Sequence, residues 1–358
     1  MNSTLYVIVP DLPPKINGIG DYSFILSKAL NSNGISLNIE FIVAGNSNYE
    51  FKYLDGFKVH VLNLKSAMSL FFLLRNLNSS LIHLHYVGYG FAKRGAPLWL
   101  YLGLFIWKLK RGVILITTFH ELYAISKYPW TSSFWNQWLQ RLICKNIFLI
   151  SKCVITSRDS YRKILFNFSS SIEINVLPVF SNFGEMKEYQ EMELREKGLI
   201  ILGSKSTRSN IYKSYQKELN IICQKHSLNR IIDVGPKIFS LPKLVVPVVE
   251  FGILEAIEIS GLLKKNSFGI ILGLNSNHFA KSGVFASYTS HGIIVVVLDA
   301  NLSKIEDGII PNKHFISIDS KNINCDYISK SSYEWYQNHT LEKQCLKYFN
   351  IFIKNLKI

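Results

Sequence analysis

Residues 13–30 read PPKINGIGDYSFILSKAL, and they follow an apolar run, LYVIVP, with the length and composition of a buried strand. Within the stretch, Gly18-Ile-Gly20 precedes a segment with the spacing of an amphipathic helix, Tyr22 to Leu30. A strand, a glycine-bearing loop and a helix in this order open a βαβ unit. In such units ligands bind at the carboxyl edge of the sheet.

Apolar runs typical of strands alternate with segments of helical periodicity along the whole chain, which predicts an α/β protein with parallel sheets. A charged, polar segment divides the alternating elements into two sets, and 358 residues are enough for two cores. We expect an N-terminal Rossmann-like domain (1–183), a linker (184–198), a second Rossmann-like domain (199–330) and a terminal helix (331–358) that packs back toward the first domain. Among the other expected helices, one spans residues 210–226.

Composition and charge limit the possible partners. The 40 Lys and Arg residues outnumber the 25 Asp and Glu residues, so the surface attracts anions: nucleic acid, phosphorylated substrates or an anionic bilayer. Basic residues beside large apolar ones, as in FIWKLKRG, favour lipid headgroups over a nucleic-acid groove. We expect an anionic membrane surface, and no nucleic acid, as a partner. Around residues 128–152 the mixture of Trp and basic residues fits either a bilayer interface or the core packing of a long helix.

The five cysteines have no Cys-x-x-Cys spacing and no paired histidines nearby, so we expect neither a zinc site nor a disulfide framework. The first residues, MNSTLYVIVPD, lack the basic region and cleavage site of a secretory signal. The longest apolar stretch, residues 96–107, is too short to span a bilayer. We therefore expect a cytoplasmic protein, peripheral on the inner face of the cell membrane.

The opening loop has three interpretations. In a nicotinamide-binding unit the glycines follow the strand directly, whereas here a proline-rich insert intervenes and Glu40 lies inside the next strand rather than at its end. This disfavours a dinucleotide site. Gly18 and Gly20 can instead let backbone amides approach a phosphate beside the helix dipole at Asp21, or they can simply form a tight turn.

The same loop resembles the N-terminal loop and helix of GT-B glycosyltransferases of the family 4 type. VEFGILEAIEISGLLKKNSFGIILG resembles the stretch that lines the nucleotide pocket of that family, and FAKSGVFASYTSHGIIVVV resembles its donor-binding loop and helix. The family commonly carries two glutamates eight positions apart. Here the corresponding positions hold Phe279 and Ser287, so this chain resembles a subgroup that lacks the paired donor-site glutamates.

The resemblance implies a hexosyltransferase that moves a sugar from a nucleotide-diphosphate donor to an acceptor hydroxyl in a cleft between the two domains. It also implies retention of configuration, no metal and no cofactor, a glycan or polyprenyl-linked acceptor, and a role in cell-surface polysaccharide or glycolipid synthesis. Two alternatives stay open. One is a sugar-nucleotide epimerase, and the other is a degenerate GT-B subunit that binds without transferring sugar.

Apart from the two glycines of the opening loop, the donor-binding candidates lie in the second domain. Arg208 is our choice to neutralise the departing diphosphate, because a planar guanidinium suits phosphate oxygens. The serine and the basic residues among the donor-binding candidates also have a structural interpretation, the serine as an N-cap and the basic residues as solvated cations. Asp233 and Gly235 end another strand and can shape the same site. The full set of expected donor-binding residues is Gly18, Gly20, Gly203, Lys205, Lys213, Lys281, Ser282 and Gly283.

Candidates for the acceptor side lie in the first domain. His120 and Glu121 follow an apolar strand and are expected, with Arg208, to be catalytic, because polar groups at a strand's carboxyl end face the site. Strand alternation places His83 and His85 on one side of their strand, without a carboxylate or Cys at metal-ligand spacing. We expect no metal there. The expected acceptor-binding residues are Asp21, His85 and Tyr86.

Overall fold

The structure, a computed structural model, describes residues 4–15, 17–32, 37–45, 49–77, 79–110, 112–126, 128–238, 240–273, 278–300 and 305–356. It divides into two compact units. Unit 1 comprises residues 1–178 together with 341–358, and unit 2 comprises residues 179–340.

In unit 1 the strands pair in the order β3-β4-β2-β1-β5-β6-β7-β8, in parallel except for the antiparallel pair β3 and β4. The strands are β1 (Thr4–Val9), β2 (Asn38–Val43), β3 (Tyr53–Leu54), β4 (Phe57–Val61), β5 (Leu81–Tyr86), β6 (Ile114–Phe119), β7 (Cys153–Thr156) and β8 (Glu173–Val176). The helices are α1 (Gly18–Ser32), α2 (Ala67–Asn76), α3 (Gly88–Phe91), α4 (Leu98–Lys108), α5 (Ser132–Ile150), α6 (Asp159–Phe166) and α12 (Leu341–Leu356).

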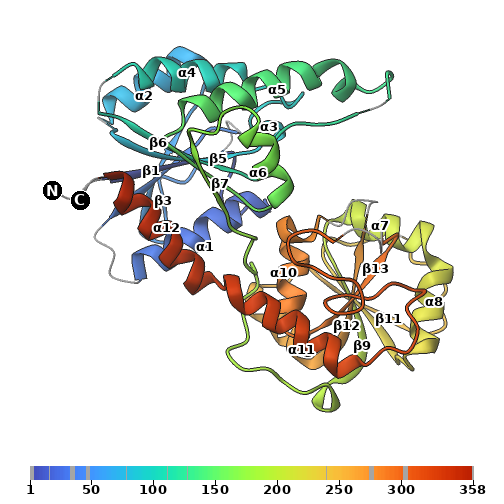
Figure 1. The fold of residues 1–358 in the computed structure, drawn as a ribbon. Coiled ribbons are helices and arrows are strands. Elements are labelled where there is room, and N and C mark those ends of the chain that lie inside the picture. The colour runs from blue at the N-terminus through green and yellow to red at the C-terminus, as the bar shows by residue number, and fades with distance from the viewer. Residues whose placement is uncertain are drawn as a thin grey trace. The chain divides into compact units, whose positions relative to one another are not determined.

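Helices cover both faces of this sheet, which is why β5 is buried along its whole length and β1 at every position after Thr4. Figure 1 shows α2, α4 and α5 over one face, with α1 and α12 over the other. Side chains alternate along β5: Ile82 and Leu84 join the core cluster under α2, α4 and α5, whereas His83 packs against Phe352 of α12. The histidines of β5 therefore face the α1 and α12 side.

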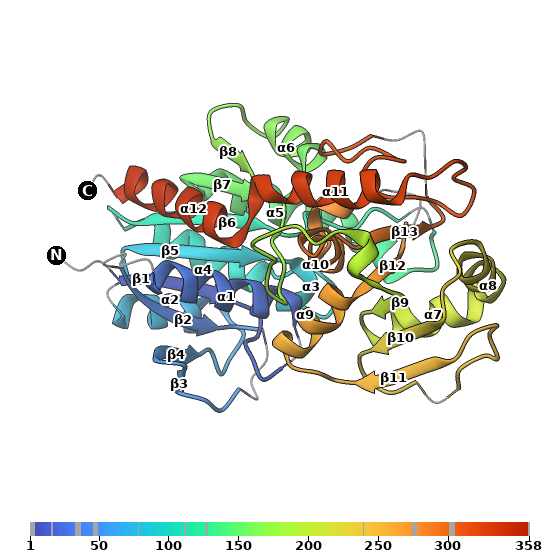
Figure 2. The ribbon, with the colours of Figure 1, turned by 90° about the horizontal axis from the view of Figure 1, so that it is seen from below.

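The terminal segment is two helices rather than the expected one. α11 (Cys325–Tyr336) belongs to unit 2 and α12 belongs to unit 1, and the chain is extended at Thr340 between them. Figure 2 shows α12 running alongside α1, as expected for a terminal helix that packs on the N-terminal domain. The Tyr22 hydroxyl of α1 donates to Oε1 of Gln344 at 3.1 Å and lies 3.3 Å from the Tyr348 hydroxyl.

In unit 2 the strands are all parallel and pair in the order β11-β10-β9-β12-β13. They are β9 (Glu196–Leu202), β10 (Arg230–Val234), β11 (Val248–Gly252), β12 (Asn266–Leu272) and β13 (Ile294–Leu298). Its helices are α7 (Lys205–Ser214), α8 (Gln216–Lys225), α9 (Ala256–Lys265), α10 (Gly283–Ser290) and α11, with single 3₁₀ turns η1 (Met192–Leu194), η2 (Phe279–Lys281) and η3 (Gln337–His339).

The central strand β9 has a core on each face. Leu199 and Ile201 pack with residues of α7 and α8, whereas Ile200 and Leu202 pack with residues of α9 and α10. Two apolar faces explain the unbroken run LIIL within the strand. Each unit is thus a parallel sheet with helices on both sides, the Rossmann-like arrangement that the alternation predicted.

The boundaries differ from those expected in two places. Unit 2 begins at Val179, and the proposed linker ends inside β9, because Glu196–Gly198 already pair with neighbouring strands. The helix expected over residues 210–226 is two helices, since α7 begins at Lys205 and the chain leaves helical geometry at Tyr215.

Candidate functional site

The loop before α1 holds the start of that helix close to the end of β1. Asn17 Oδ1 accepts hydrogen bonds from the amides of Ile19 and Gly20 at 3.0 and 3.1 Å, which satisfies two of the first helical amides. Gly20 is buried, and a Cβ there would lie 2.4 Å from the carbonyl oxygen of Asp11. A Cβ added at Gly18 would have no other atom within 4 Å. Gly20 therefore serves close packing, whereas Gly18 lies on the surface.

Three histidines gather where β5 and β6 end. His85 Nδ1 lies 2.9 Å from His120 Nε2, and the two rings stack at 20° with centroids 5.2 Å apart. The His83 and His85 rings are 4.2 Å apart, as their placement on one side of β5 predicted. His83 and His85 are buried, while His120, directly after β6, is partly exposed. His120 is thus the member of the group that can reach a ligand.

A hydrogen-bonded chain supports this group from α1 and α12. His83 Nε2 lies 2.8 Å from the Thr118 hydroxyl, which lies 3.2 Å from the Tyr348 hydroxyl. The Tyr22 and His120 rings are nearly perpendicular, at 82°, with centroids 5.3 Å apart. The histidines are therefore held from both helices that cover this face of the sheet.

All three histidines are neutral at physiological pH. Burial, with His120 nearby, lowers the pKa of His83 to about 3, and burial lowers the pKa of His120 to about 4. Burial and the two neighbouring rings also lower the pKa of His85 well below its usual value. A neutral imidazole both donates and accepts one hydrogen bond, so His120 is suited to binding a hydroxyl rather than to neutralising an anion.

Other predicted residues of unit 1 lie in different surroundings. Tyr86 points to the opposite face from His85: it is fully buried in the core cluster, 5.2 Å from the Phe119 ring. The prediction that Tyr86 binds the acceptor is therefore wrong, since its side chain is enclosed. Asp21 lies in the first turn of α1, where burial raises the pKa of its carboxyl to about 6. Glu121 is exposed next to His120.

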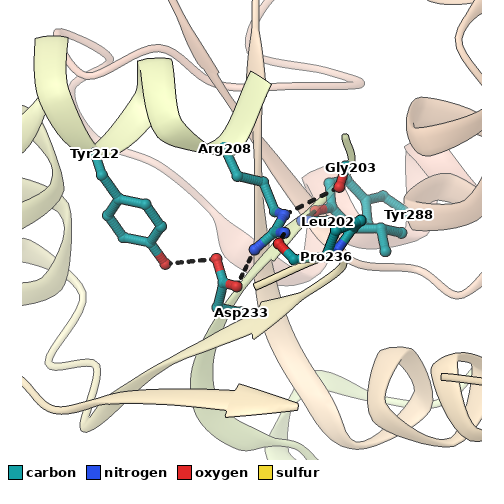
Figure 3. A network of polar contacts seen from close by, with 7 residues as sticks. All are labelled: Leu202, Gly203, Arg208, Tyr212, Asp233, Pro236 and Tyr288. Atoms are coloured by element: carbon teal, nitrogen blue, oxygen red, sulfur yellow. Dashed lines mark hydrogen bonds and ion pairs between the residues drawn. The ribbon is translucent and has the colours of Figure 1, made fainter. Parts of the chain in front are cut away.

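Arg208 of α7 is fully buried and lies in a polar network at the carboxyl edge of unit 2 (Figure 3). Its guanidinium pairs with the Asp233 carboxylate and donates to the carbonyl of Pro236 and, at 3.0 Å, to that of Gly203. The Tyr212 hydroxyl donates to the other Asp233 oxygen at 2.9 Å. Burial raises the pKa of Asp233, while Arg208 and Tyr212 act in the opposite direction.

This network links the loops that follow β9 and β10. Gly235 has a φ of +141°, and a Cβ there would lie 2.5 Å from the carbonyl oxygen of Gly203 and 2.7 Å from Arg208 Nε. Arg208 was expected to contact a diphosphate directly, but its guanidinium is directed into the protein. The geometry favours a positioning role, in which Arg208 and Asp233 hold the Gly203 and Gly235 loops together.

The predicted lysines of α7 are far apart. Lys205 is exposed at the first helical position, beside Gly203, whereas Lys213 is exposed in the last turn. Eight residues of helix span about 12 Å. Only Lys205 is therefore close to the end of β9, and Lys213 is not placed to bind the same phosphate.

At the start of α10, Ser282 is the helix N-cap, which is the structural role considered as the alternative to phosphate binding. The Ser282 hydroxyl accepts from the amide of Phe285 at 3.2 Å as an N-cap, a contact that uses one of its lone pairs and not its O–H. Gly283 opens the helix, and Lys281 ends the preceding turn. Phe279 and Ser287, which stand where glutamates were expected, are both buried, Ser287 with its hydroxyl donating to the Gly283 carbonyl at 2.7 Å.

Sequence reasoning missed the supporting residues of the histidine group. Gln344, Tyr348 and Phe352 recur every fourth residue on α12, which places them on one helical face. A polar and aromatic stripe on an otherwise amphipathic helix was the available signal. Within the described ranges, no three His, Cys, Asp or Glu side chains are grouped so that they could hold a metal ion.

No protein-family model matches the chain, and no curated protein matches it. Solved structures do share its fold. An α-glucosyltransferase in complex with UDP-glucose and DNA containing an abasic site is 10% identical over 98% of this chain and 99% of that chain, with a TM-score of 0.58. HepE of Anabaena in complex with UDP-glucose is 10% identical over 97% and 99%, with a TM-score of 0.59. A putative UDP-N-acetylglucosamine 2-epimerase from Listeria monocytogenes is 11% identical over 100% and 97%, with a TM-score of 0.56.

These matches agree with the two parallel sheets and their covering helices. The chain therefore has an α/β fold of the GT-B class, with two Rossmann-like units. They also overturn one expectation. Nucleic acid was excluded as a partner, but similar structures contain DNA together with UDP-glucose or UDP, so proteins of this fold do combine nucleic acid with a nucleotide sugar.

Proposed function

We propose that this protein is a glycosyltransferase that moves a sugar from a nucleotide-diphosphate donor to an acceptor hydroxyl, and that it is of the family 4 type. The observation that carries the proposal is the fold itself. Both units match a glycosyltransferase that holds UDP-glucose, over 98% of this chain and 99% of the other. The side chains at the two carboxyl edges are chemically suited to such a reaction.

In unit 2 the donor diphosphate is proposed to bind at the end of β9. The Ser204 hydroxyl caps the amide of Thr207 at 3.2 Å, the preceding amides at the start of α7 point out of the helix, and Lys205 supplies a cation at the same position. The buried pair of Arg208 and Asp233 holds the Gly203 and Gly235 loops in shape for this contact. We assign Arg208 to positioning and Lys205 to neutralising the charge that develops on the departing diphosphate.

In unit 1 His120 is proposed to bind a hydroxyl of the transferred sugar or of the acceptor. Its low pKa keeps it neutral, and because its Nε2 is engaged by His85 Nδ1 at 2.9 Å, its other ring nitrogen, Nδ1, offers a single uncharged hydrogen bond to the ligand. Asp21, with a pKa of about 6, can accept a proton from an acceptor hydroxyl near neutral pH. We further propose that transfer retains the configuration of the sugar and needs neither metal nor cofactor. The anomer formed, read by NMR, and turnover in EDTA test these two points.

The proposal is tested first by nucleotide binding. Thermal unfolding of the purified protein is followed with UDP, GDP, ADP, TDP and CMP, and one nucleotide is expected to raise the melting temperature by several degrees. Lys205→Ala should reduce that shift, whereas the matched surface variant Lys213→Ala should keep it. A protein stabilised by none of these nucleotides would contradict the proposal and favour a non-catalytic GT-B subunit.

Turnover is then measured as nucleotide release from the matching sugar donor, with and without an acceptor. We propose a lipid-linked glycan as the acceptor, in keeping with a role in surface polysaccharide or glycolipid synthesis. A 13-mer DNA containing an HMU base is tested in parallel, because a similar structure holds such DNA together with UDP. If neither acceptor raises nucleotide release above the rate of donor hydrolysis, both proposed acceptors are refuted.

A second candidate function is sugar-nucleotide epimerisation, because an epimerase shares the fold over the whole of this chain. The two reactions differ in what they need. An epimerase converts UDP-N-acetylglucosamine without any acceptor, whereas a transferase leaves the donor sugar's C2 configuration intact. The 2-epimer in the proton NMR spectrum of an acceptor-free mixture would favour the second candidate.

A further inference from the structure

The helices on one face of unit 1 expose an apolar surface. α2, α4 and α5 lie together over the sheet (Figure 1), and their inner sides form the core beneath. On α4 the exposed apolar residues recur at spacings of four, three and four, which is one side of a helix. The exposed apolar residues of the three helices are Met68, Phe72, Leu98, Leu102, Phe105, Leu109 just after α4, Trp135, Trp138, Leu142 and Leu149.

Aromatic residues are especially exposed on α5 and just before it. Trp135 and Trp138 are 66% and 65% exposed, and Trp130 is 80% exposed. Sequence reasoning left open whether these residues pack in a core or face outward. Their exposure shows that the core packing of α5 does not use them. Buried positions of the same helix, such as Ile143 and Ile147, fill that role.

Positive charge accompanies this surface. Between residues 56 and 158 the sequence has thirteen Lys and Arg residues and a single acidic residue, Glu121. This segment therefore carries most of the +15 formal charge of the chain. Exposed cations border the apolar residues: Arg75 ends α2, Lys93 and Arg94 precede α4, and Arg141 and Lys145 share the exposed side of α5 with Trp138.

We propose that the outer face of α2, α4 and α5 docks the protein on an anionic lipid bilayer. Apolar side chains at this face enter the headgroup and acyl boundary, the tryptophans lie at headgroup depth, and the surrounding cations pair with lipid phosphates. In the described part of the chain no helix is long and apolar enough to cross a membrane. The proposed contact is therefore with the surface of the bilayer.

The composition of the face favours a bilayer over nucleic acid or a second copy of the chain. A nucleic-acid surface uses cations with aromatic platforms, and rows of exposed Leu and Phe add nothing to phosphate binding. A second copy would bring one strongly positive face against another, which costs energy for like charges. Lipid phosphates complement the charge, and the acyl region complements the apolar residues.

The test is co-sedimentation of the full chain with phosphatidylcholine vesicles, with and without phosphatidylglycerol. Binding is expected only with the anionic lipid, accompanied by a blue shift of tryptophan fluorescence. Trp135→Ala with Trp138→Ala, and separately Arg141→Glu with Lys145→Glu, should each weaken binding about tenfold or more. All four residues are exposed, so the melting temperature should not change.

A matched control reverses two exposed lysines of unit 2, Lys217→Glu with Lys330→Glu, and should bind vesicles like the wild type. If this control lost as much vesicle binding as the Arg141→Glu with Lys145→Glu variant, net charge alone would explain the binding and the proposal would be overturned. So would tight binding of a labelled DNA duplex that the tryptophan variant retains, with no binding to vesicles. A dimer that becomes monomeric in the tryptophan variant, again without vesicle binding, would assign the face to a second copy. None of these outcomes depends on the proposed transferase activity.

Discussion

Nδ1 of His85 lies 2.9 Å from Nε2 of His120, and the remaining nitrogen of His85, Nε2, is buried without a hydrogen-bond partner among the described residues. A buried acceptor without a partner is tolerated better than a buried N–H without one. The proton of His85 is therefore assigned to Nδ1, which donates to His120 Nε2. His120 must then carry its own proton on Nδ1, so His85 determines the tautomer that His120 presents to a ligand.

Replacing His85 by Phe should lower turnover without removing His120. Loss of the orienting partner is expected to cost about ten- to a hundredfold in kcat, the range seen for groups that orient metal-bound histidines. The ¹⁵N chemical shifts of His120 should change from those of the Nδ1–H form to a mixture. His60→Phe, on β4 of the same sheet, is the control and should keep wild-type turnover. Unchanged ¹⁵N shifts in the His85 variant would contradict the tautomer assignment.

The buried histidines should make unit 1 sensitive to acid. Their folded-state pKa values lie below the unfolded value near 6.5, so the unfolded chain binds more protons once the pH falls below that value. The stability they contribute is complete above pH 6.5 and is lost as the pH falls toward 4. Each histidine should add about 1.4 kcal/mol per pH unit to the slope within that window. Urea unfolding between pH 4 and 7 measures it, and His83→Gln should flatten the curve.

Asp21 should act in the opposite direction. Its folded-state pKa, about 6, lies above the ordinary value of 3.8 for an aspartate, so its contribution to stability is present below pH 3.8 and is lost as the pH rises through 6. Asp21→Asn should match the wild type in melting temperature near pH 3.5 and exceed it at pH 8. A variant that is destabilised equally at both pH values would show that the carboxylate is not desolvated.

The two-unit fold and the histidine pair were predictable from sequence for different reasons. Apolar runs with helical segments between them report the sheets directly, and alternation on β5 correctly placed His83 and His85 together. Tyr86 was assigned wrongly because adjacent strand residues face opposite sides, and sequence alone did not show which side holds the core. The partner of Arg208 was missed because Arg208 and Asp233 are 25 positions apart in the sequence and are brought together only by the pairing of β9 with β10.

The pair formed by Arg208 and Asp233 should be important for the stability of unit 2. Asp233→Asn leaves a buried guanidinium without its counter-charge, which typically costs about 3–5 kcal/mol. The exposed pair of Glu196 and Arg230 joins the same two strands and is the matched control. Glu196→Gln should cost about 0–1 kcal/mol. Urea unfolding monitored by amide hydrogen exchange in β9 and β10 compares the two, and equal costs would show that burial of the first pair is unimportant.

The two glycines of the loop before α1 should respond differently to the same substitution. At Gly20 a Cβ would lie 2.4 Å from the backbone oxygen of Asp11, so Gly20→Ala must push α1 away from the end of β1. Such overpacking typically costs about 1–3 kcal/mol. Gly18→Ala meets nothing within 4 Å and should leave the melting temperature unchanged or slightly raised. If both variants lost the same stability, the close approach at Gly20 would not be what requires glycine. If Gly18→Ala alone abolished the nucleotide-induced shift in melting temperature, the exposed glycine would contribute to ligand binding instead.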